Sequence, residues 1–322
     1  MSKKTLITGC CGMMGSHMVD LFYDRGEMVH GTFYKPTTNL NEFAHKAHLE
    51  ECDVRYFLPL YRIIDKIRPD VIHHLAAQSY PTVSLKRPQE TFEINVTGTI
   101  NVFESIKEIR KTDPSYDPVV VVACSSAEYG SSLTPENVPI KEDVTLLPLH
   151  PYGVTKVVQD LLSYQYFVSD RIKAIRARIF NTTGPRKVND APSDFVRRAV
   201  QIEKGKETVF RVGNLEARRA ITDVRDLIQA LIALSEKGKH GEVYNISGSK
   251  VYQIKDVVSM IEKIMGRKFD IRVDQSLIRP TDEPIIYGDS SRLTRDTGWK
   301  QSYTLEQTLA DMIDYWRTSP LP

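Results

Sequence analysis

The sequence predicts an α/β fold, a doubly wound parallel sheet with helices on both faces, followed by a smaller C-terminal α/β lobe. Three observations lead to this prediction. Short β-prone segments alternate with amphipathic helical patterns as far as residue 180. Three closely spaced glycines follow the first of these segments. An unbroken run of valines at 119–122 is typical of a strand that is buried on both faces of a parallel sheet.

The predicted elements follow one another in a regular order. Strands are expected at 4–8, 28–33, 71–76, 119–124 and 173–180, with helical patterns between them. The stretch 181–217 is rich in Gly, Pro, Asn and Arg and departs from this pattern, whereas 223–237 is helical again. We therefore expect two lobes that are interleaved in sequence. The sheet lobe comprises 1–180, with 218–245 and about 285–297 returning to it, and the smaller lobe comprises 181–217, 246–284 and 298–322.

A glycine-rich loop lies at the first strand–helix junction. Gly9, Gly12 and Gly15 stand between the β-prone run 5–8 and an amphipathic pattern that begins near Met14. Residues without a Cβ let a strand turn sharply into a helix, and they let a pyrophosphate approach the free N–H groups of that helix. The spacing is Gly-x-x-Gly-x-x-Gly rather than Gly-x-Gly-x-x-Gly. Its position nevertheless predicts dinucleotide binding by a Rossmann-type domain.

Tyr152 and Lys156 form the main candidate catalytic pair. Residues four apart on a helix lie about 6 Å apart along its axis and on the same face. We expect the Lys156 ammonium to favour the ionised phenol and to lower the pKa of Tyr152 from about 10 toward neutrality, which would make it a general acid/base for a hydroxyl or ketone. Ser125 and Ser126 end the valine-rich strand, where a hydroxyl can hold the same substrate oxygen.

Composition gives no reason to propose a nucleic-acid or membrane partner. The net charge is +2, and no apolar run approaches the roughly 18 residues of a membrane span. Cys10, Cys11, Cys52 and Cys124 lack metal-like spacing, so no metal site is predicted. We expect packed, reduced thiols in a cytoplasmic protein.

Nine motifs that cover nearly the whole chain resemble those of extended short-chain dehydrogenases/reductases that modify nucleotide sugars. They are TGCCGMMG (8–15), HLAAQS (74–79), INVTGT (94–99), SSAEYG (125–130), PYGVTK (151–156), FNTTGP (180–185), VGNLEARR (212–219), TDVRDL (222–227) and RPTDEP (279–284). Within this family the chain is similar to GDP-mannose 4,6-dehydratases and, more closely, to GDP-4-keto-6-deoxy-mannose reductases. The block from VGNLEA through RPTDEP to DTGW (296–299) favours the reductase branch.

The resemblance implies a set of site residues. The catalytic residues would be Ser125, Tyr152 and Lys156. The cofactor would be bound by Gly9, Gly12, Met13, Met14, Gly15, Tyr34, Lys35, Asp53, Val54, Leu75, Ala76, Ala77, Asn95, Tyr152 and Lys156. The substrate would be bound by Gln78, Ser79, Ser126, Asn181, Asn214, Arg219, Arg279 and Glu283. The family often has Asp after the phosphate-binding arginine, where this chain has Ala220, which puts the local salt-bridge geometry in doubt.

NADP(H) is the favoured cofactor, and NAD(H) is possible. An NAD enzyme usually places a carboxylate at the end of the second strand to bind the ribose 2′-OH. Here that strand ends in Thr32, Phe33, Tyr34 and Lys35, without an acid. Lys35 could pair with a 2′-phosphate, or it could be an ordinary solvated loop charge. Asn95, at an expected helix start, could equally be a structural cap.

One departure from the family pattern bears on the reaction. Dehydratases of this family place an acid two residues after the catalytic Ser or Thr, and here that position is Ala127. Glu128 comes one residue later, where strand-like alternation would turn it to the opposite side. A methyl group cannot donate a proton, so a GDP-mannose 4,6-dehydratase is disfavoured, although a shift of register through the loop could rescue Glu128. Similar reductases often have a glutamate at this place as well, so Ala127 argues against elimination without proving reduction.

The predicted function is therefore NAD(P)-dependent redox chemistry at C4, with reduction of GDP-4-keto-6-deoxy-D-mannose to a GDP-6-deoxyhexose as the main hypothesis. A C4 dehydrogenase or C4 epimerase of a GDP-hexose or heptose would use the same residues. A non-catalytic dinucleotide-binding regulator predicts damage to Ser125, Tyr152 or Lys156, and all three are intact. The expected partners are a GDP-sugar and further copies of the chain, as a homodimer or homotetramer. The resemblance implies pairing through long helices, and 154–167 has spare apolar positions.

Overall fold

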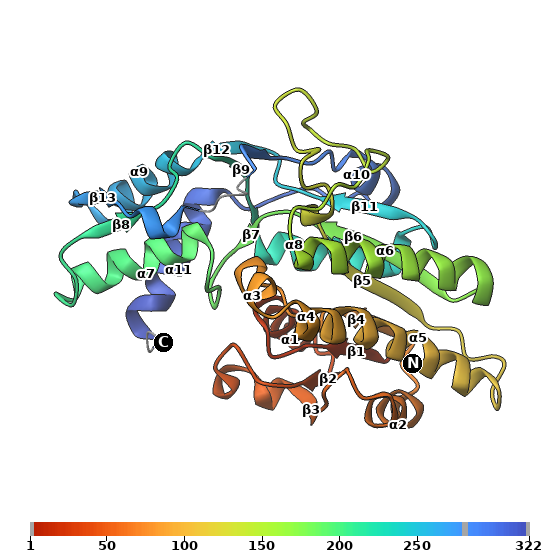
Figure 1. The fold of residues 1–322 in the computed structure, drawn as a ribbon. Coiled ribbons are helices and arrows are strands. Elements are labelled where there is room, and N and C mark those ends of the chain that lie inside the picture. Colours follow the sequence, from red (N-terminus) through yellow and green to blue (C-terminus); the bar gives the residue numbers. More distant parts are fainter. Residues whose placement is uncertain (1–2, 279–282, 320–322) are drawn as a thin grey trace.

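The computed structural model describes residues 3–278 and 283–319. Within this part of the chain, seven strands form one parallel sheet in the order β11-β6-β5-β4-β1-β2-β3 (Figure 1). The strands are β1 Thr5–Thr8, β2 Val29–Phe33, β3 Ala47–Glu51, β4 Val71–His74, β5 Val119–Ser125, β6 Lys173–Ile179 and β11 Val243–Ile246. The chain runs outward from β1 in both directions, which confirms the predicted doubly wound sheet.

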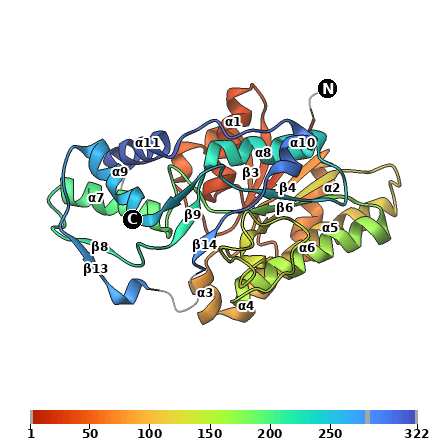
Figure 2. The same cartoon turned by 90° about the horizontal axis from the view of Figure 1, so that it is seen from above.

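Helices cover both faces of the sheet (Figure 2). Buried side chains of α2, α5 and α6 pack with the strands on one face, and those of α1 and α8 pack on the other. These helices are α1 Met13–Asp24, α2 Phe57–Ile67, α5 Gly98–Arg110, α6 Pro151–Asp170 and α8 Val224–Lys237. Two short helices, α3 Pro81–Lys86 and α4 Pro88–Phe92, follow β4.

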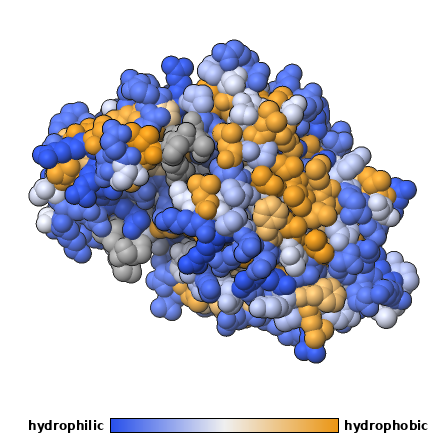
Figure 3. Space-filling view, viewed as in Figure 1, coloured by the Kyte–Doolittle hydropathy of each residue, from blue (hydrophilic) through white to orange (hydrophobic). Residues whose placement is uncertain are grey.

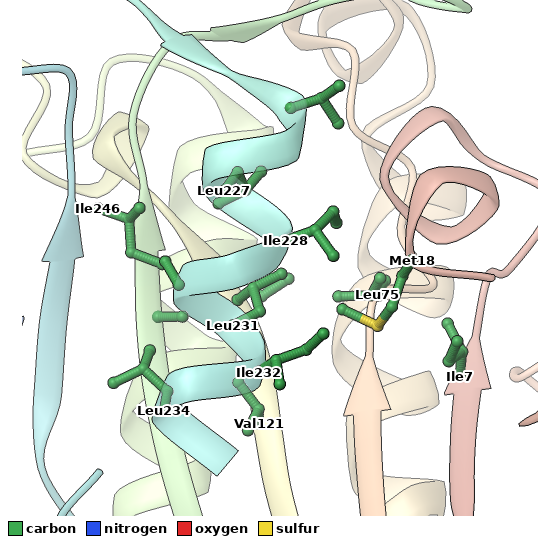
Figure 4. Close-up of a cluster of buried hydrophobic side chains, with 14 of the residues drawn as sticks. Ile7, Met18, Leu75, Val121, Leu227, Ile228, Leu231, Ile232, Leu234 and Ile246 are labelled. Carbon is green, nitrogen blue, oxygen red and sulfur yellow. The ribbon is translucent and has the colours of Figure 1, made fainter. Parts of the chain in front are cut away.

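Helix α8 supplies much of one core. Figure 4 shows its leucine and isoleucine side chains meeting Val121 and Ile246 of the sheet, with Ile7, Met18 and Leu75 nearby. Leu227, Leu231 and Leu234 have no exposed surface. Three apolar positions separated by three or four residues form one face of a helix, which explains why 223–237 returns to the sheet.

The five predicted strands match observed strands, but β3 and β11 at the two edges of the sheet were not predicted. The segment Ala47–Glu51 reads AHLEE and remains partly exposed, so it lacks the β-branched pattern of a buried strand. β11 has only four residues. Its four residues are all buried, but they include Asn245, so the segment is too short and too mixed to show a clear apolar pattern.

The remaining C-terminal elements surround a separate apolar cluster (Figure 1). They comprise α7 Ala191–Glu203, β8 Phe210–Val212, β9 Arg218–Ala220, β12 Val251–Gln253, α9 Ile254–Met265, β13 Ile271–Val273, β14 Ile285–Ile286 and α11 Leu305–Thr318. The short strands β7 Thr182–Thr183 and β10 Thr222–Asp223 pair between the two regions, and α10 Ser291–Thr297 packs beside β11. Among the described helices, none has the length and apolar character needed to span a bilayer.

Candidate active site

A cavity of about 750 Å³ opens at the carboxyl edge of the sheet. Its walls include the glycine loop after β1, the ends of β2, β4, β5 and β6, and the first turns of α6. Arg219, Ser276 and Glu283 close it from the C-terminal side. Ligands bind at this edge of open parallel sheets, so the position agrees with the predicted site.

The glycine loop leaves the start of α1 accessible to a phosphate. Gly9 has a φ of 71°, and a Cβ on Gly15 would lie 2.5 Å from the Cα of Cys10. The helix begins after Gly12, and no side chain in the described part of the chain caps it. Its first N–H groups and the positive end of its dipole therefore face the cavity, and these residues fit the pyrophosphate of a dinucleotide.

Two cationic side chains lie beside Tyr34 at the end of β2. The Lys35 Nζ lies 5.1 Å from the centre of the Tyr34 ring, and the Arg55 guanidinium lies 5.9 Å from the same centre. Arg55, which the sequence interpretation missed, also binds the Asp53 carboxylate at 2.6 Å. Burial works to raise the pKa of Asp53, but the hydrogen bonds from Arg55 outweigh it and lower that pKa. The only sequence signal for Arg55 was its position two residues after Asp53.

Ser125, Tyr152 and Lys156 are brought together on one wall of the cavity. Ser125 ends β5, and α6 begins after His150, whose Nδ1 accepts the N–H of Gly153 at 3.1 Å. A Cβ on Gly153 would lie 2.6 Å from the Ala127 carbonyl oxygen, so glycine allows the helix to approach the loop after β5. The Lys156 Nζ donates a hydrogen bond to the Ala123 carbonyl at 2.7 Å.

The prediction that the Lys156 ammonium lowers the pKa of Tyr152 is wrong. Burial raises the pKa of Tyr152 to about 12, although a hydrogen bond with the Ser125 hydroxyl works in the opposite direction. Burial also lowers the pKa of Lys156 to about 8. Desolvation disfavours the charged form of both groups, and it dominates here because both are almost fully buried. The phenol is consequently protonated at neutral pH.

The loop after β5 turns Ala127 and Glu128 in different directions. Ala127 lines the cavity, whereas the Glu128 side chain has no exposed surface and its Oε1 accepts the N–H of Ser125 at 2.8 Å. The sequence interpretation expected this separation from strand-like alternation. The structure has a 3₁₀ turn at Ser126–Glu128 instead, capped by Ser125.

Most of the other predicted site residues lie on the cavity wall. They are Met13, Met14, Val54, Leu75, Ala76, Ala77, Gln78, Ser79, Ser126, Asn181, Arg219 and Glu283. The Asn181 Oδ1 is buried without a hydrogen-bond partner in the described part of the chain, as expected for an atom that awaits a ligand. The Arg219 Nη1 donates to the Glu283 carbonyl at 2.8 Å, which joins two of the predicted substrate residues.

Three predicted residues are not placed on this wall. Asn95 is fully buried in a π-helical turn before α5, where its amide accepts the N–H of Gln78 and donates to Thr155 Oγ1. It therefore holds the loop after β4 against α6. Asn214 accepts the N–H of Glu216 and is not among the described residues that line the cavity. Arg279 lies outside the described residues.

The chain is similar to enzymes that act on nucleotide sugars. GDP-6-deoxy-D-mannose reductase of Pseudomonas aeruginosa is 26% identical over 252 residues, which are 78% of this chain and 81% of that protein. A solved structure of RMD from Pseudomonas aeruginosa complexed with NADPH superposes with a TM-score of 0.81 at 22% identity, covering 98% of this chain and 99% of the other. UDP-glucose 4-epimerase with UDP-glucose from Thermotoga maritima gives a TM-score of 0.88 at 22% identity, covering 98% of each chain, and these two likenesses confirm the fold.

The family model described as GDP-mannose 4,6 dehydratase matches residues 6–312, and the chain belongs to that family.

Proposed function

We propose that this chain is an NAD(P)-dependent C4 oxidoreductase of a nucleotide sugar that reduces GDP-4-keto-6-deoxy-D-mannose to a GDP-6-deoxyhexose. One observation carries the proposal. Ser125, Tyr152 and Lys156 share a cavity wall with the methyl group of Ala127, while the carboxylate of Glu128 points away from the cavity. The site thus has a proton donor for a C4 oxygen, whereas Ala127 stands at the position where the family resemblance requires an acid for elimination at C6. The similarity to the reductase of Pseudomonas aeruginosa supports this choice.

The chemistry of the side chains follows from their protonation states. A bound reduced nicotinamide would supply a hydride for C4. Tyr152, protonated because burial raises its pKa to about 12, donates its phenolic proton to the C4 oxygen as the C=O bond becomes a C–O–H group. The Lys156 ammonium stabilises the phenolate that remains, and the Ser125 hydroxyl orients the carbonyl.

We propose NADP(H) as the preferred cofactor, with NAD(H) as the alternative. Lys35 and Arg55 stand beside Tyr34 at the end of β2, where a 2′-phosphate would lie. Asp53 is occupied by Arg55, with which it forms an ion pair at 2.6 Å. A guanidinium and an ammonium favour a phosphate over a free hydroxyl at this position.

The nucleotide sugar would bind on the C-terminal side of the cavity. Arg219 would bind the diphosphate, and the free Asn181 Oδ1 would accept a hydrogen bond from the substrate. The smaller lobe of residues 181–217, 246–284 and 298–322 would then be the nucleotide-sugar-binding lobe, and Glu283 would reach the nucleoside end.

The test supplies purified protein with GDP-4-keto-6-deoxy-D-mannose and NADPH and follows NADPH oxidation together with the nucleotide-sugar product. We expect a GDP-6-deoxyhexose. In parallel, GDP-mannose with NADP⁺ should give no 4-keto-6-deoxy product, because Ala127 cannot protonate the leaving C6 hydroxyl. Substantial product in that second reaction would overturn the argument from Ala127. Oxidation or C4 inversion of a GDP-hexose without net reduction would instead assign a dehydrogenase or an epimerase.

We also propose that the chain forms a homo-oligomer through α6. Val154, Leu161, Tyr164 and Val168 are exposed on this helix, and Figure 3 shows apolar surface gathered over it. Residues seven apart recur on the same side of a helix, so Val154, Leu161 and Val168 form one stripe. A cytoplasmic location agrees with the four free cysteines.

A further inference from the structure

A buried acid lies directly behind the proposed catalytic wall and takes no part in the chemistry described above. The Glu128 side chain has no exposed surface. Its Oε1 accepts the main-chain N–H of Ser125 at 2.8 Å, and its Oε2 lies 3.1 Å from the Arg178 Nε. Burying a carboxylate costs several kcal/mol unless it is well compensated, so this placement calls for an explanation.

Glu128 belongs to a compact network of charges. The Arg178 Nε also binds Asp160 at 2.9 Å, and Asp160 binds Arg176 at 2.7 Å. Two carboxylates are thus balanced by two guanidiniums. One ligand atom each from Cys124, Glu128 and Asp160 lies within 4.8 Å of the others. Because the Arg178 guanidinium already supplies the positive charge between the two acids, this cluster does not call for a metal ion.

The same network fixes the loop that carries Ser125. The Ser125 Oγ accepts the N–H of Ala127 at 3.2 Å, while Glu128 accepts the N–H of Ser125, so both ends of the turn are tied. Arg178 also anchors Tyr129, the residue after Glu128, because its Nη1 donates a hydrogen bond to the Tyr129 hydroxyl at 2.9 Å. A hydroxyl that must reach the C4 oxygen needs such a fixed main chain.

We propose that Glu128 is a positioning residue for C4 chemistry: it holds the main chain of Ser125, and its charge acts through the protein interior on Tyr152 and Lys156. The proposal rests on the function proposed above. It adds a role for a buried residue that is not among the described residues lining the cavity.

The charge of Glu128 shifts the pKa values of Tyr152 and Lys156 in a definite direction. The groups that face Glu128 are Arg178 from β6, Asp160, Lys156 and Tyr152 from α6, and Cys124 and Tyr129 from its own strand and turn. Burial and the charge of Asp160 work to raise the pKa of Glu128, whereas the Arg178 guanidinium at 3.1 Å and the N–H of Ser125 favour its charged form. The negative charge of Glu128 in turn works to raise the pKa of both Tyr152 and Lys156. Removing that charge should therefore lower both pKa values.

Glu128→Gln tests the charge, because the amide oxygen can still accept the N–H of Ser125. The protein is prepared with isotope-labelled lysine and NADPH bound, and the side-chain NMR signal of Lys156, assigned from its loss in Lys156→Met, is titrated with pH. We expect the titration of Lys156 to move to lower pH in Glu128→Gln. This measurement needs no sugar substrate, so it stays interpretable if the proposed reaction proves wrong.

Glu142→Gln is the matched control. Glu142 is also buried, accepts the N–H of Asn245 at 3.0 Å and lies 3.6 Å from Arg292, but its carboxylate does not contact Ser125. The Lys156 titration should stay in place in this variant. An unmoved titration in Glu128→Gln, or an equal movement in Glu142→Gln, would overturn the electrostatic role.

Glu128→Asp tests the positioning role, because it keeps the charge and shortens the side chain. We expect kcat to fall about tenfold, as for the loss of one hydrogen bond to a charged group, with KM unchanged and the Lys156 titration near its original pH. Unchanged kcat would remove the positioning half of the proposal. Should Glu128→Gln fail to fold, as shown by thermal unfolding, the charge-balanced Glu128→Gln/Arg178→Gln variant, in which Asp160 keeps its ion pair with Arg176, is titrated in its place, with the same expected direction and the same overturning result.

Discussion

The ammonium nitrogen of Lys156 lies 5.6 Å from the centre of the Tyr152 ring and is hydrogen-bonded to the Ala123 carbonyl. Helix α6 therefore places Tyr152 and Lys156 close together, as predicted, and the main chain of β5 holds the ammonium in place. Because both groups are buried, the neutral forms gain relative to the charged ones, and the pair begins as a protonated phenol beside an amine with a pKa of about 8. This state suits a site that gives a proton to a ketone.

Replacing Tyr152 with Phe should lower turnover by about 100- to 10,000-fold, the usual contribution of a positioned acid. The ring and its packing are retained, so NADPH affinity, measured by fluorescence titration, should change little. Tyr164→Phe is the control, because Tyr164 is exposed on the same helix. Comparable activity in Tyr152→Phe would remove the proposed proton donor.

The pH dependence of kcat should follow the protonation state of Lys156. Burial lowers its pKa to about 8, so the ammonium is present below that pH and is lost as the pH rises through it. If the ammonium stabilises the phenolate, kcat should decline on the alkaline side with an inflection near the same value. In Lys156→Arg the side chain stays charged, and this inflection should disappear from the measured range, whatever the remaining rate. An inflection that persists in Lys156→Arg would have to be assigned to another group.

The parts of the site that sequence analysis could predict are those built from local spacing. Gly9, Gly12 and Gly15 span one loop and the first turn of α1, and Tyr152 and Lys156 lie on one helix, so their relationship is fixed by helix and turn geometry. The network of Glu128, Asp160 and Arg178 joins a turn, a helix and a strand, and only the packed sheet brings them together. The pKa of Tyr152 was mispredicted for the same reason, because burial is a property of the whole fold.

Cofactor preference should depend on Lys35 and Arg55. Removing either charge with Ala should raise the KM for NADPH by about tenfold to a hundredfold, the worth of one charge-assisted hydrogen bond, while the KM for NADH changes much less. Lys111→Ala, which removes an exposed charge of α5's C-cap, is the control and should leave both values unchanged. Equal losses for NADPH and NADH would place these two side chains away from the 2′-phosphate.

Core stability should be sensitive to α8. Leu231 has no exposed surface, whereas Leu85 is 62% exposed. Leu231→Ala should lower the free energy of unfolding by about 2–5 kcal/mol, because it removes buried contacts and leaves a cavity. Leu85→Ala should stay within about 0.5 kcal/mol of the original protein. Chemical denaturation of both variants measures this difference, and similar losses would contradict the assignment of α8 to the core.

The apolar stripe on α6 should control assembly. Leu161 is 55% exposed on the helix that carries the catalytic pair. A charge at its centre cannot be buried without a large desolvation cost, so Leu161→Asp should shift the mass measured by light scattering toward that of one chain. Lys111→Asp, at the exposed C-cap of α5, should leave the mass unaltered. Since Leu161 points away from the cavity, NADPH binding should survive in Leu161→Asp, and a variant that keeps the full assembly would show that another surface joins the subunits.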